Sequence, residues 1–386
     1  MSAEEFLAGN AARLVEVRRD LHAHPELGDE ERRTTQLVGD ALSHAGLQPR
    51  VLPSGTGLVC DIGTNPVVGL RADLDALPIP DEKDVPYRSM VPGVAHACGH
   101  DVHTTVVLGA GLALARLAAA GSLPHGVRLI FQPAEETVPG GALGVIRAGE
   151  LDGLSQLFAL HCDPSVDVGK IGLRTGSITS ASDHVDVALT GPGGHTARPH
   201  LTADLVSALG AVVDRSPGLL ARRIDVRSGV NLVWGQVSAG AVANVIPRSG
   251  LARGTVRILD RDGWARLPAV LEDVIQTIAS PYGVGVEVTY IRGVPPVVNA
   301  ASSVDLLRRV VTDEWGVDAI VEAEQSLGGE DFGWMVEQVP GALARLGVRS
   351  PGSTLSVDLH QSTFDVDERC LSIGVRLMVA AALAAG

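Results

Sequence analysis

The feature that most constrains the fold is a regular alternation of apolar runs, each ending in polar residues, with segments of helical periodicity. Strands are expected at 67–73, 127–132 and 157–161, and helices at 3–22, 30–45 and 104–119. This alternation is typical of an α/β fold whose sheet is mostly parallel. In such sheets the functional site lies beyond the carboxyl ends of the strands. The polar residues expected there are Asp73, Asp75, Glu135, Glu136 and His161.

The pattern changes near residue 180, where Val185-Asp-Val-Ala-Leu-Thr190 alternates like a half-exposed strand. A helix is then expected at 201–215, strands near 231 and 251, a helix at 264–278 and a strand at 284–291. We interpret this segment as a small α+β unit inserted into a larger domain. The larger domain would comprise 1–180 and 293–386, with further helices at 303–315 and 369–385, and the insertion would comprise 181–292.

Composition and charge exclude several classes of protein. The chain has 386 residues, enough for two domains, and its net charge of −14 argues against nucleic acid as a partner. No secretory signal pattern is present. The most apolar helical stretch, 106–120, contains Arg116 and is expected to be too short to span a membrane. The four cysteines form no CxxC pair, so we expect a cytoplasmic protein without disulfides.

The densest group of chemically active side chains is His96-Ala-Cys-Gly-His-Asp-Val-His103. It offers three histidines, one cysteine and one aspartate directly before a predicted helix. Imidazole and thiolate are ligands that suit zinc or a similar metal ion. The alternative is a histidine-rich loop that binds no metal.

Three further groups follow predicted strands or lie near the C-terminus. They are Gln132-Pro-Ala-Glu-Glu136, His161 and His360. Adjacent carboxylates can divide their roles, one binding metal and the other accepting a proton from water. Taken singly, the glutamates could form a solvated turn and each histidine could simply be hydrogen-bonded. Taken together, the groups are typical of a two-metal hydrolase of the aminopeptidase type.

The order of the motifs resembles the M20 metallopeptidase family, in particular its amidohydrolase branch, and the resemblance spans nearly the whole chain. The matching motifs are Arg19-Asp-Leu-His-Ala-His-Pro-Glu-Leu27, Leu70-Arg-Ala-Asp-Leu-Asp-Ala-Leu-Pro78, His96-Ala-Cys-Gly-His-Asp101, Gln132-Pro-Ala-Glu-Glu136, Gly193-Gly-His195, Asn244-Val-Ile-Pro247, Gly254-Thr-Val-Arg257, Gly328-Gly-Glu-Asp-Phe332 and Leu359-His360. No Gly-x-Ser-x-Gly elbow and no P-loop is present.

The resemblance implies a dinuclear metallohydrolase domain with an inserted α+β lid through which two copies dimerise. It implies two divalent metal ions per subunit (zinc, manganese, cobalt or nickel), and as their ligands Cys98, His100, Glu136, His161 and His360. It further implies Glu135 as the catalytic base and Asp75 as an outer residue that orients the ligands. In the lid it implies His195 as a catalytic residue reaching the partner's site, and as substrate-binding residues Asn244, Arg257, Gly328 and Gly329.

The resemblance implies hydrolysis of the amide bond of N-acyl amino acids by a metal-activated water. A dipeptidase or an N-acetyl-diaminopimelate deacetylase of the same family is an alternative, and a metal-binding protein without catalysis is a more remote one. The sequence departs from many relatives after Glu136, where Thr137-Val-Pro139 replaces a run of glycines. It also lacks a proline that often follows the residue corresponding to His360. Both departures concern substrate specificity and leave every implied ligand in place.

Overall fold

The computed structural model describes residues 3–353 and 357–385, and the chain divides into two compact units. The first unit contains the chain up to Ile178, Val298–Glu324 and the chain from Asp331 onward. The second contains Thr179–Val297 and Gln325–Glu330.

The second unit differs from the expected insertion of 181–292 in its limits and in one added segment. It begins at Thr179 and ends at Val297, and it also includes Gln325–Glu330, which we expected in the larger domain. Hydrogen bonds explain this difference. The amide of Ser180 donates to the carbonyl of Ser326 at 3.0 Å, and the Ser180 hydroxyl donates to the carbonyl of Leu327 at 2.9 Å.

An eight-stranded sheet forms the centre of the described part of the first unit, in the order β1-β2-β4-β3-β5-β16-β6-β15. Its strands are β1 (Arg50–Val51), β2 (Leu58–Ile62), β3 (Pro66–Asp73), β4 (Gly126–Gln132), β5 (Gln156–Asp167), β6 (Ile171–Leu173), β15 (Ile320–Glu322) and β16 (Gly341–Arg349). The adjacent strands β4, β3, β5 and β16 are parallel. The expected α/β class with a mostly parallel sheet is therefore confirmed. Two short strands, β7 (Gly176–Ser177) and β14 (Val298–Asn299), pair separately.

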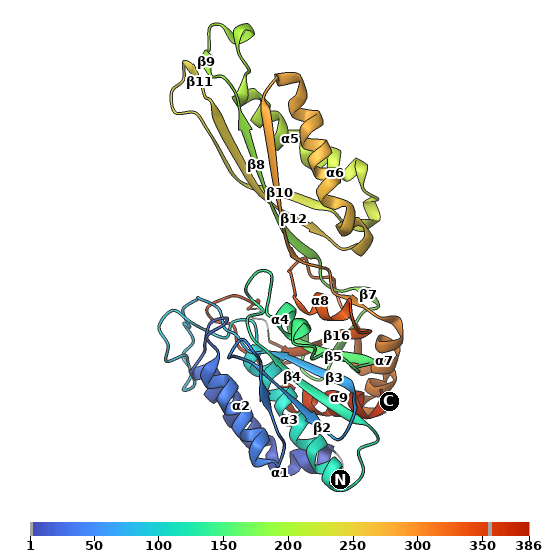
Figure 1. The fold of residues 1–386 in the computed structure, drawn as a ribbon. Coiled ribbons are helices and arrows are strands. Elements are labelled where there is room, and N and C mark those ends of the chain that lie inside the picture. Colours follow the sequence, from blue (N-terminus) through green and yellow to red (C-terminus); the bar gives the residue numbers. More distant parts are fainter. Residues whose placement is uncertain (1–2, 354–356, 386) are drawn as a thin grey trace. The chain divides into compact units, whose positions relative to one another are not determined.

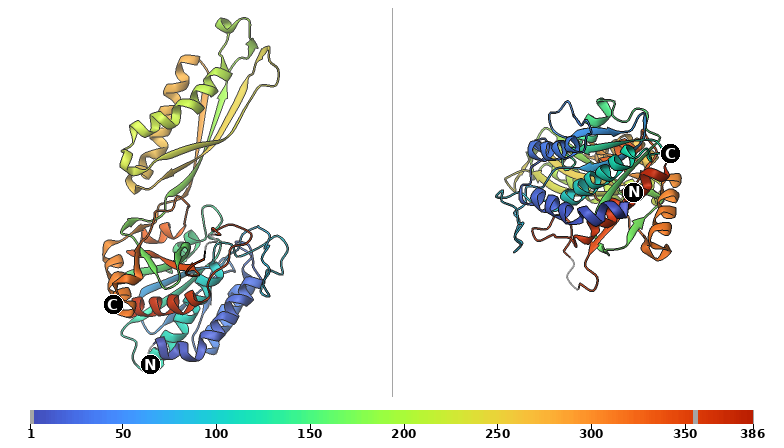
Figure 2. Two further views of the ribbon diagram at one scale, coloured as in Figure 1. Left: turned by 180° about the vertical axis from the view of Figure 1, so that it is seen from behind. Right: turned by 90° about the horizontal axis from the view of Figure 1, so that it is seen from below.

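Helices surround this sheet because its central strands are largely apolar and buried, so both faces must be covered. All of β4 is buried. The helices are α1 (Ala3–Ala23), α2 (Arg32–His44), α3 (His100–Ala119), α4 (Ala142–Arg147), α7 (Ala301–Trp315), α8 (Phe332–Val336) and α9 (Arg369–Ala384). Helix α3 packs against α1 and α9, as Figure 1 shows. Helices α1 and α9 both belong to this unit, which Figure 2 shows from two further sides.

Helix α3 corrects two sequence-based expectations. It begins at His100 rather than 104, because Gly99 adopts a left-handed conformation (φ 88°) directly before it. With 20 residues it is long and apolar enough to cross a membrane, contrary to our expectation of a stretch too short to do so. Most of its apolar surface is buried inside the first unit, as expected for a core helix.

The second unit contains a four-stranded antiparallel sheet in the order β10-β12-β8-β13. Its elements are β8 (Ala181–Thr190), β9 (Gly194–His195), α5 (Leu205–Arg223), β10 (Asn231–Ala239), β11 (Val245–Ile246), β12 (Ser249–Ile258), α6 (Arg261–Ala279) and β13 (Gly285–Val294). Alternate residues of β8 are buried, because α5 and α6 pack on one face of the sheet (Figure 1).

Helix α5 differs from the expected helix at 201–215. It begins after Asp204, whose side chain accepts a hydrogen bond from the amide of Ser207. It continues past Pro217 to Arg223. The apolar face, which includes the buried Val212 and Leu220, extends across the proline and favours the longer helix.

Asp183 of β8 is a fully buried carboxylate that joins three parts of the second unit. It accepts hydrogen bonds from the indole Nε1 of Trp264 and the hydroxyl of Tyr290, both at 2.6 Å, and from the amide of Gly293 at 2.8 Å. These three donors belong to α6 and β13, so a single carboxylate fastens a helix and an edge strand to β8.

We predict that Asp183→Ala lowers the free energy of unfolding by at least about 3 kcal/mol, because it leaves buried donors without an acceptor. Asp186→Ala in the same strand is the matched control. Its exposed ion pair with Arg253 should be worth less than about 1 kcal/mol. Chemical denaturation of both variants measures the difference, and equal losses would contradict this role for Asp183.

Candidate metal centre

The side chains expected to bind metal come together at the carboxyl edge of the parallel strands. Glu135 and Glu136 follow β4, and Asp75 follows β3. His360 lies between β16 and α9. His161 was expected at the end of its strand, but β5 continues to Asp167. It nevertheless lies beyond the part of β5 that pairs with β3, since that pairing ends at Ala159.

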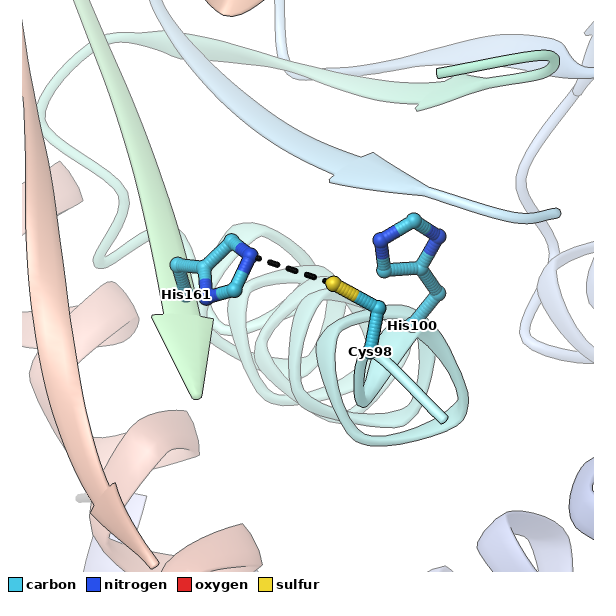
Figure 3. A group of neighbouring side chains, drawn as sticks. All are labelled: Cys98, His100 and His161. Carbon is cyan, nitrogen blue, oxygen red and sulfur yellow. Dashed lines mark hydrogen bonds between the residues drawn. The ribbon is translucent and has the colours of Figure 1, made fainter. Parts of the chain in front are cut away.

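Cys98, His100 and His161 form a buried group of one thiol and two imidazoles. Their candidate ligand atoms all lie within 4.8 Å of one another. Cys98 Sγ is 3.5 Å from His161 Nε2, and it lies between the two imidazole rings in Figure 3. The three residues are 7%, 1% and 8% exposed, so their polar atoms are removed from water. A soft sulfur and two imidazole nitrogens are a donor set that suits zinc and related ions.

Glu136 and His360 extend this group on the side of Cys98. Cys98, Glu136 and His360 also have ligand atoms within 4.8 Å of one another, as do His100, Glu135 and Glu136. His360 Nε2 is 3.3 Å from Glu136 Oε1. The His360 backbone is left-handed (φ 62°), and its amide donates to the carbonyl of Ala97 at 2.8 Å. All five expected ligands and Glu135 are therefore brought together by the first unit alone.

Backbone carbonyls set the orientation of the two buried imidazoles. His100 Nδ1 donates to the carbonyl of Asp75, and His161 Nδ1 donates to the carbonyl of Cys162, both at 2.8 Å. A carbonyl can only accept, so Nδ1 carries a proton, and in the neutral ring the lone pair is on Nε2. His100 Nε2 is buried and makes no hydrogen bond in the described part of the chain. Rings held in this way fit a metal ion.

His103 lies near the same group but has both ring nitrogens engaged. Its Nδ1 donates to Asp73 Oδ1 at 2.7 Å, and its Nε2 accepts from the amide of Cys162 at 2.9 Å. Asp73 also accepts from Arg71 at 2.7 Å. These bonds explain why Asp73 and His103, although close to His100, serve as structural supports. The pattern of the sequence did not distinguish His103 from His100.

Asp75 connects two of the segments that carry expected ligands. Its carboxylate accepts hydrogen bonds from the amides of Glu135 at 3.0 Å and Glu136 at 2.8 Å. Its carbonyl accepts a hydrogen bond from His100. Asp75 is only 1% exposed. It thus lies behind the ligands, where an orienting residue would have to be.

The charges around the group are balanced by opposite neighbours. Burial raises the pKa of the Cys98 thiol, and burial together with the charge of Arg345 lowers the pKa of His161. Burial disfavours protonation of His100, but Asp73, Asp75 and Cys98 together outweigh it and raise the His100 pKa well above its usual range. A bound cation would favour the thiolate and the neutral imidazoles, the forms in which these residues bind metals.

A buried ionic network anchors the start of α3, next to Cys98 and His100. Asp101 accepts from Arg18 Nε and from His22 Nδ1, both at 2.7 Å, and Arg18 also pairs with Asp365 at 2.9 Å. Burial opposes ionisation of Asp101, but the charges of Arg18 and His22 outweigh it and hold the Asp101 pKa well below its usual range. The network explains why charged residues occur inside the apolar face of α1.

The other expected site residues belong to the second unit. His195 and Asn244 lie where β9 pairs with β11, at one end of this unit. Arg257 lies near the opposite end of β12, where its guanidinium donates to the carbonyl of Leu327. Gly328 and Gly329 follow Leu327. A side chain at position 329 would come within 2.9 Å of Val294 and 3.1 Å of Ser182, which accounts for glycine there.

Sequence reasoning missed two buried carboxylates beside the Glu135 loop. Glu31 accepts the amide of Ala134 at 2.7 Å, and Asp331 accepts from Gln132 at 2.7 Å and from the amide of Ala142 at 2.9 Å. Asp331 belongs to a motif that we noted, but no sequence signal showed what it binds. Glu31 lies in a run of acidic residues that gives no sign of burial.

A buried group of thiol, imidazole and carboxylate donors at the carboxyl edge of a mostly parallel sheet is characteristic of a metal-dependent hydrolase. Residues 69–384 match the sequence profile of Peptidase family M20/M25/M40, so the chain belongs to this family. The resemblance based on the motifs is thereby confirmed. Members of this family are hydrolases, and this chain is an amidohydrolase of the M20 family.

Curated relatives cover almost the whole chain. A protein of Rhodococcus jostii named "Putative glutamate--cysteine ligase 2-3" is 52% identical over 370 residues. The match covers 95% of this chain but 46% of that protein, so the chain spans about half the length of this relative. N-acetylcysteine deacetylase of Bacillus subtilis is 33% identical over 365 residues, which cover 94% of this chain and 93% of the relative.

Solved structures agree with this assignment. A crystal structure of a Bacillus subtilis protein, described as a dinuclear metal-binding peptidase from the M20 family, aligns with a TM-score of 0.85 at 31% identity. The alignment covers 98% of each chain. A dinuclear metal site in so similar a protein agrees with the donor set seen here.

We predict that bound metal protects Cys98 from alkylation and that chelation makes it reactive, because metal coordination occupies the thiolate. Cys60, Cys162 and Cys370 are 0% exposed and should remain unlabelled in the folded protein. Mass spectrometry of the labelled peptides measures this difference, with Cys98→Ser as the control. Equal labelling of Cys98 before and after chelation would count against a ligand role.

Proposed function

We propose that this chain hydrolyses the amide bond of N-acyl amino acids, with Cys98, His100, Glu136, His161 and His360 as metal ligands. The observation that carries this proposal is the convergence of these donors with a second carboxylate, Glu135. His100 Nε2 is 3.9 Å from Glu135 Oε2 and 4.0 Å from Glu136 Oε1. One glutamate can therefore bind metal while its neighbour transfers a proton.

The donor set suits two divalent ions per subunit, which could be zinc, manganese, cobalt or nickel. Cys98 belongs both to the group with His100 and His161 and to the group with Glu136 and His360, so these five residues would hold the ions. When bound, the metals supply Lewis acidity and lower the pKa of water toward neutrality.

Glu135 would accept the proton of the attacking water and return it to the leaving amine. The position of Glu135 supports this role, because the carboxylate of Asp75 accepts hydrogen bonds from the backbone amides of both Glu135 and Glu136. The two side chains are thus presented from a single fixed turn. Such positioning contributes a large part of the rate enhancement that a general base provides.

The second unit would bind the rest of the substrate. We propose that Arg257 binds the carboxylate of the substrate, since a guanidinium can bind a carboxylate through two hydrogen bonds. Arg257 already donates to the carbonyl of Leu327, directly before Gly328 and Gly329, so this loop and Arg257 would recognise the substrate together. Asn244 and His195 would act on the acyl side, with His195 stabilising the oxyanion.

Within one chain, Arg257 and His195 are too far apart to contact the same small substrate. Arg257 is eight positions along β12 from Ser249, beyond which β11 and β9 lie. A strand rises by about 3.3 Å per residue, which gives a separation of roughly 25 Å. Figure 1 shows β9 and β11 at one end of this unit. The two residues would therefore serve different sites, and His195 would complete the site of a partner subunit.

The edge strand β10 offers a surface for such a partner. Val233 and Val237 of β10 are 54% and 53% exposed, and Val242 and Val245 beyond it are similarly exposed. An exposed apolar edge strand is a ready template for pairing with another chain. We propose a homodimer formed through the second unit.

One relative suggests which amino acid to test first. It is named N-acetylcysteine deacetylase, and this name places cysteine on the amine side of the amide that is cleaved. We therefore propose N-acetylcysteine as the first substrate to test. The apolar Val138 and Pro139, exposed after Glu136, would favour an acyl group over a free, charged amine.

A panel of substrates separates the alternatives. Turnover of N-acetylcysteine or hippurate without turnover of free dipeptides supports the proposal. Preference for dipeptides would indicate a dipeptidase, and preference for N-acetyl-diaminopimelate would indicate that deacetylase. Metal binding without turnover of any amide would indicate a binding protein. Each substrate should be assayed with zinc, manganese, cobalt and nickel in turn.

We predict that Glu135→Gln binds both metals but loses at least about a hundredfold in kcat, because glutamine cannot accept the proton. Glu136→Gln is the matched comparison, since it should weaken metal binding itself. Metal content and steady-state kinetics of the purified variants measure both effects. Turnover close to wild type in metal-loaded Glu135→Gln would remove Glu135 as the base.

We predict that His195→Ala and His161→Ala, each nearly inactive, complement when mixed. A heterodimer would contain one site with both defects and one with neither. With random exchange and independent sites, an equal mixture should recover roughly a quarter of wild-type activity. Subunit exchange must first be verified, for example with differently tagged chains. Exchange without recovery would place His195 in the site of its own subunit.

A further inference from the structure

The loop between β4 and α4 presents Glu135 and Glu136 in an unusual backbone conformation. Ala134, directly before Glu135, is left-handed with a φ of 55°, and Gly140 near the end of the loop has a φ of 92°. Glycine adopts such angles freely, whereas alanine does so only under constraint from its surroundings. The conformation of Ala134 therefore requires a contact that holds it.

Buried carboxylates fasten the rest of this loop. Asp331 accepts from the side chain of Gln132 and from the amide of Ala142, so it ties the two ends together. Asp75 accepts the amides of Glu135 and Glu136 in the middle. Neither carboxylate bonds to Ala134.

The carbonyl of Ala134 accepts from the amide of Gly141 and the hydroxyl of Thr137, and Glu31 holds its amide. Glu31 Oε1 accepts the amide of Ala134 at 2.7 Å, and Glu31 is 0% exposed. The segment that precedes Glu31 packs directly on the same loop, because a side chain at Gly28 would come within 2.8 Å of Thr137 and 3.2 Å of the Ala134 Cα. Burial raises the pKa of the Glu31 carboxyl to about 7. Burying a carboxyl group costs free energy unless the group makes a hydrogen bond, and the amide of Ala134 donates that hydrogen bond to Glu31.

We propose that Glu31 is a positioning residue for Glu135, which it aims at the metal centre by holding the amide of Ala134. The inference rests on the proposed role of Glu135 as the base. If Ala134 returned to an ordinary backbone angle, the Glu135 side chain would turn away from His100 and Glu136. Small displacements of a catalytic group are costly, and a shift of about 1 Å can reduce a rate a hundredfold.

Glu31→Leu removes the acceptor, and Glu31→Gln keeps one in the same place. We expect kcat of Glu31→Leu to fall by about tenfold to a hundredfold, with KM and metal content unchanged. Glu31→Gln should keep most of the wild-type kcat. Glu30→Leu and Glu30→Gln are the matched controls, because the neighbouring Glu30 is exposed, and both should behave as wild type.

A second variant tests the backbone directly. Glycine adopts the angle of Ala134 without help, so Ala134→Gly combined with Glu31→Leu should recover at least several-fold of the lost kcat. Hydrogen exchange gives a readout independent of activity. The peptide that contains 133–141 should exchange faster in Glu31→Leu but not in Glu31→Gln. If Glu31→Leu does not fold, Glu31→Ala is measured in the same way.

Wild-type kcat in folded, metal-loaded Glu31→Leu or Glu31→Ala would overturn the proposal. Loss of metal in proportion to kcat would also overturn it, because Glu31 would then support the ligands rather than the base. Glu135→Gln is measured alongside. If that variant turns over normally, the assignment of the base is wrong; if it is inactive while Glu31→Leu is normal, only the inference about Glu31 fails.

Discussion

The metal centre depends above all on the hydrogen bonds of Asp75. Its carbonyl oxygen orients His100, and its carboxylate holds the amides of Glu135 and Glu136. One residue thereby sets the relative position of an imidazole from the start of α3 and two carboxylates from the end of β4. Without it these groups would come from two loops with independent motions. A donor set of this kind must be held in place before the metal arrives, because binding is weakened by every ligand that must first be ordered.

The charged side chains Asp73 and Asp101 can be buried near the centre because each has a partner of opposite charge. Asp73 lies between Arg71 and His103, and Asp101 lies between Arg18 and His22. An ionised group removed from water is stable only when it is paired and hydrogen-bonded. These pairs also join segments far apart in the chain. The same contacts that neutralise the interior therefore fix the helix that begins at His100.

The second unit differs from the first, because its expected catalytic and substrate-binding residues lie at opposite ends of one sheet. Asp183 makes the end near Arg257 rigid, whereas His195 and Asn244 lie on short paired strands at the other end. The segment 325–330 belongs to this unit through the hydrogen bonds of Ser180, although the chain on both sides of it belongs to the first. Substrate recognition by this segment and Arg257 would thus depend on contacts that are distant in sequence.

The sequence by itself determined the α/β class, most of the helices and strands, and the set of residues that meet at the carboxyl edge. Periodicity and the order of motifs are local properties, so they can be read without coordinates. The sequence could not tell that His103 is a structural support while His100 Nε2 makes no hydrogen bond in the described part of the chain. It also could not show that Glu31 is buried, or that residues 325–330 leave the first unit. Only the tertiary structure decided these points, because the role of a polar side chain depends on which partners satisfy its hydrogen bonds, and those partners come from distant parts of the chain.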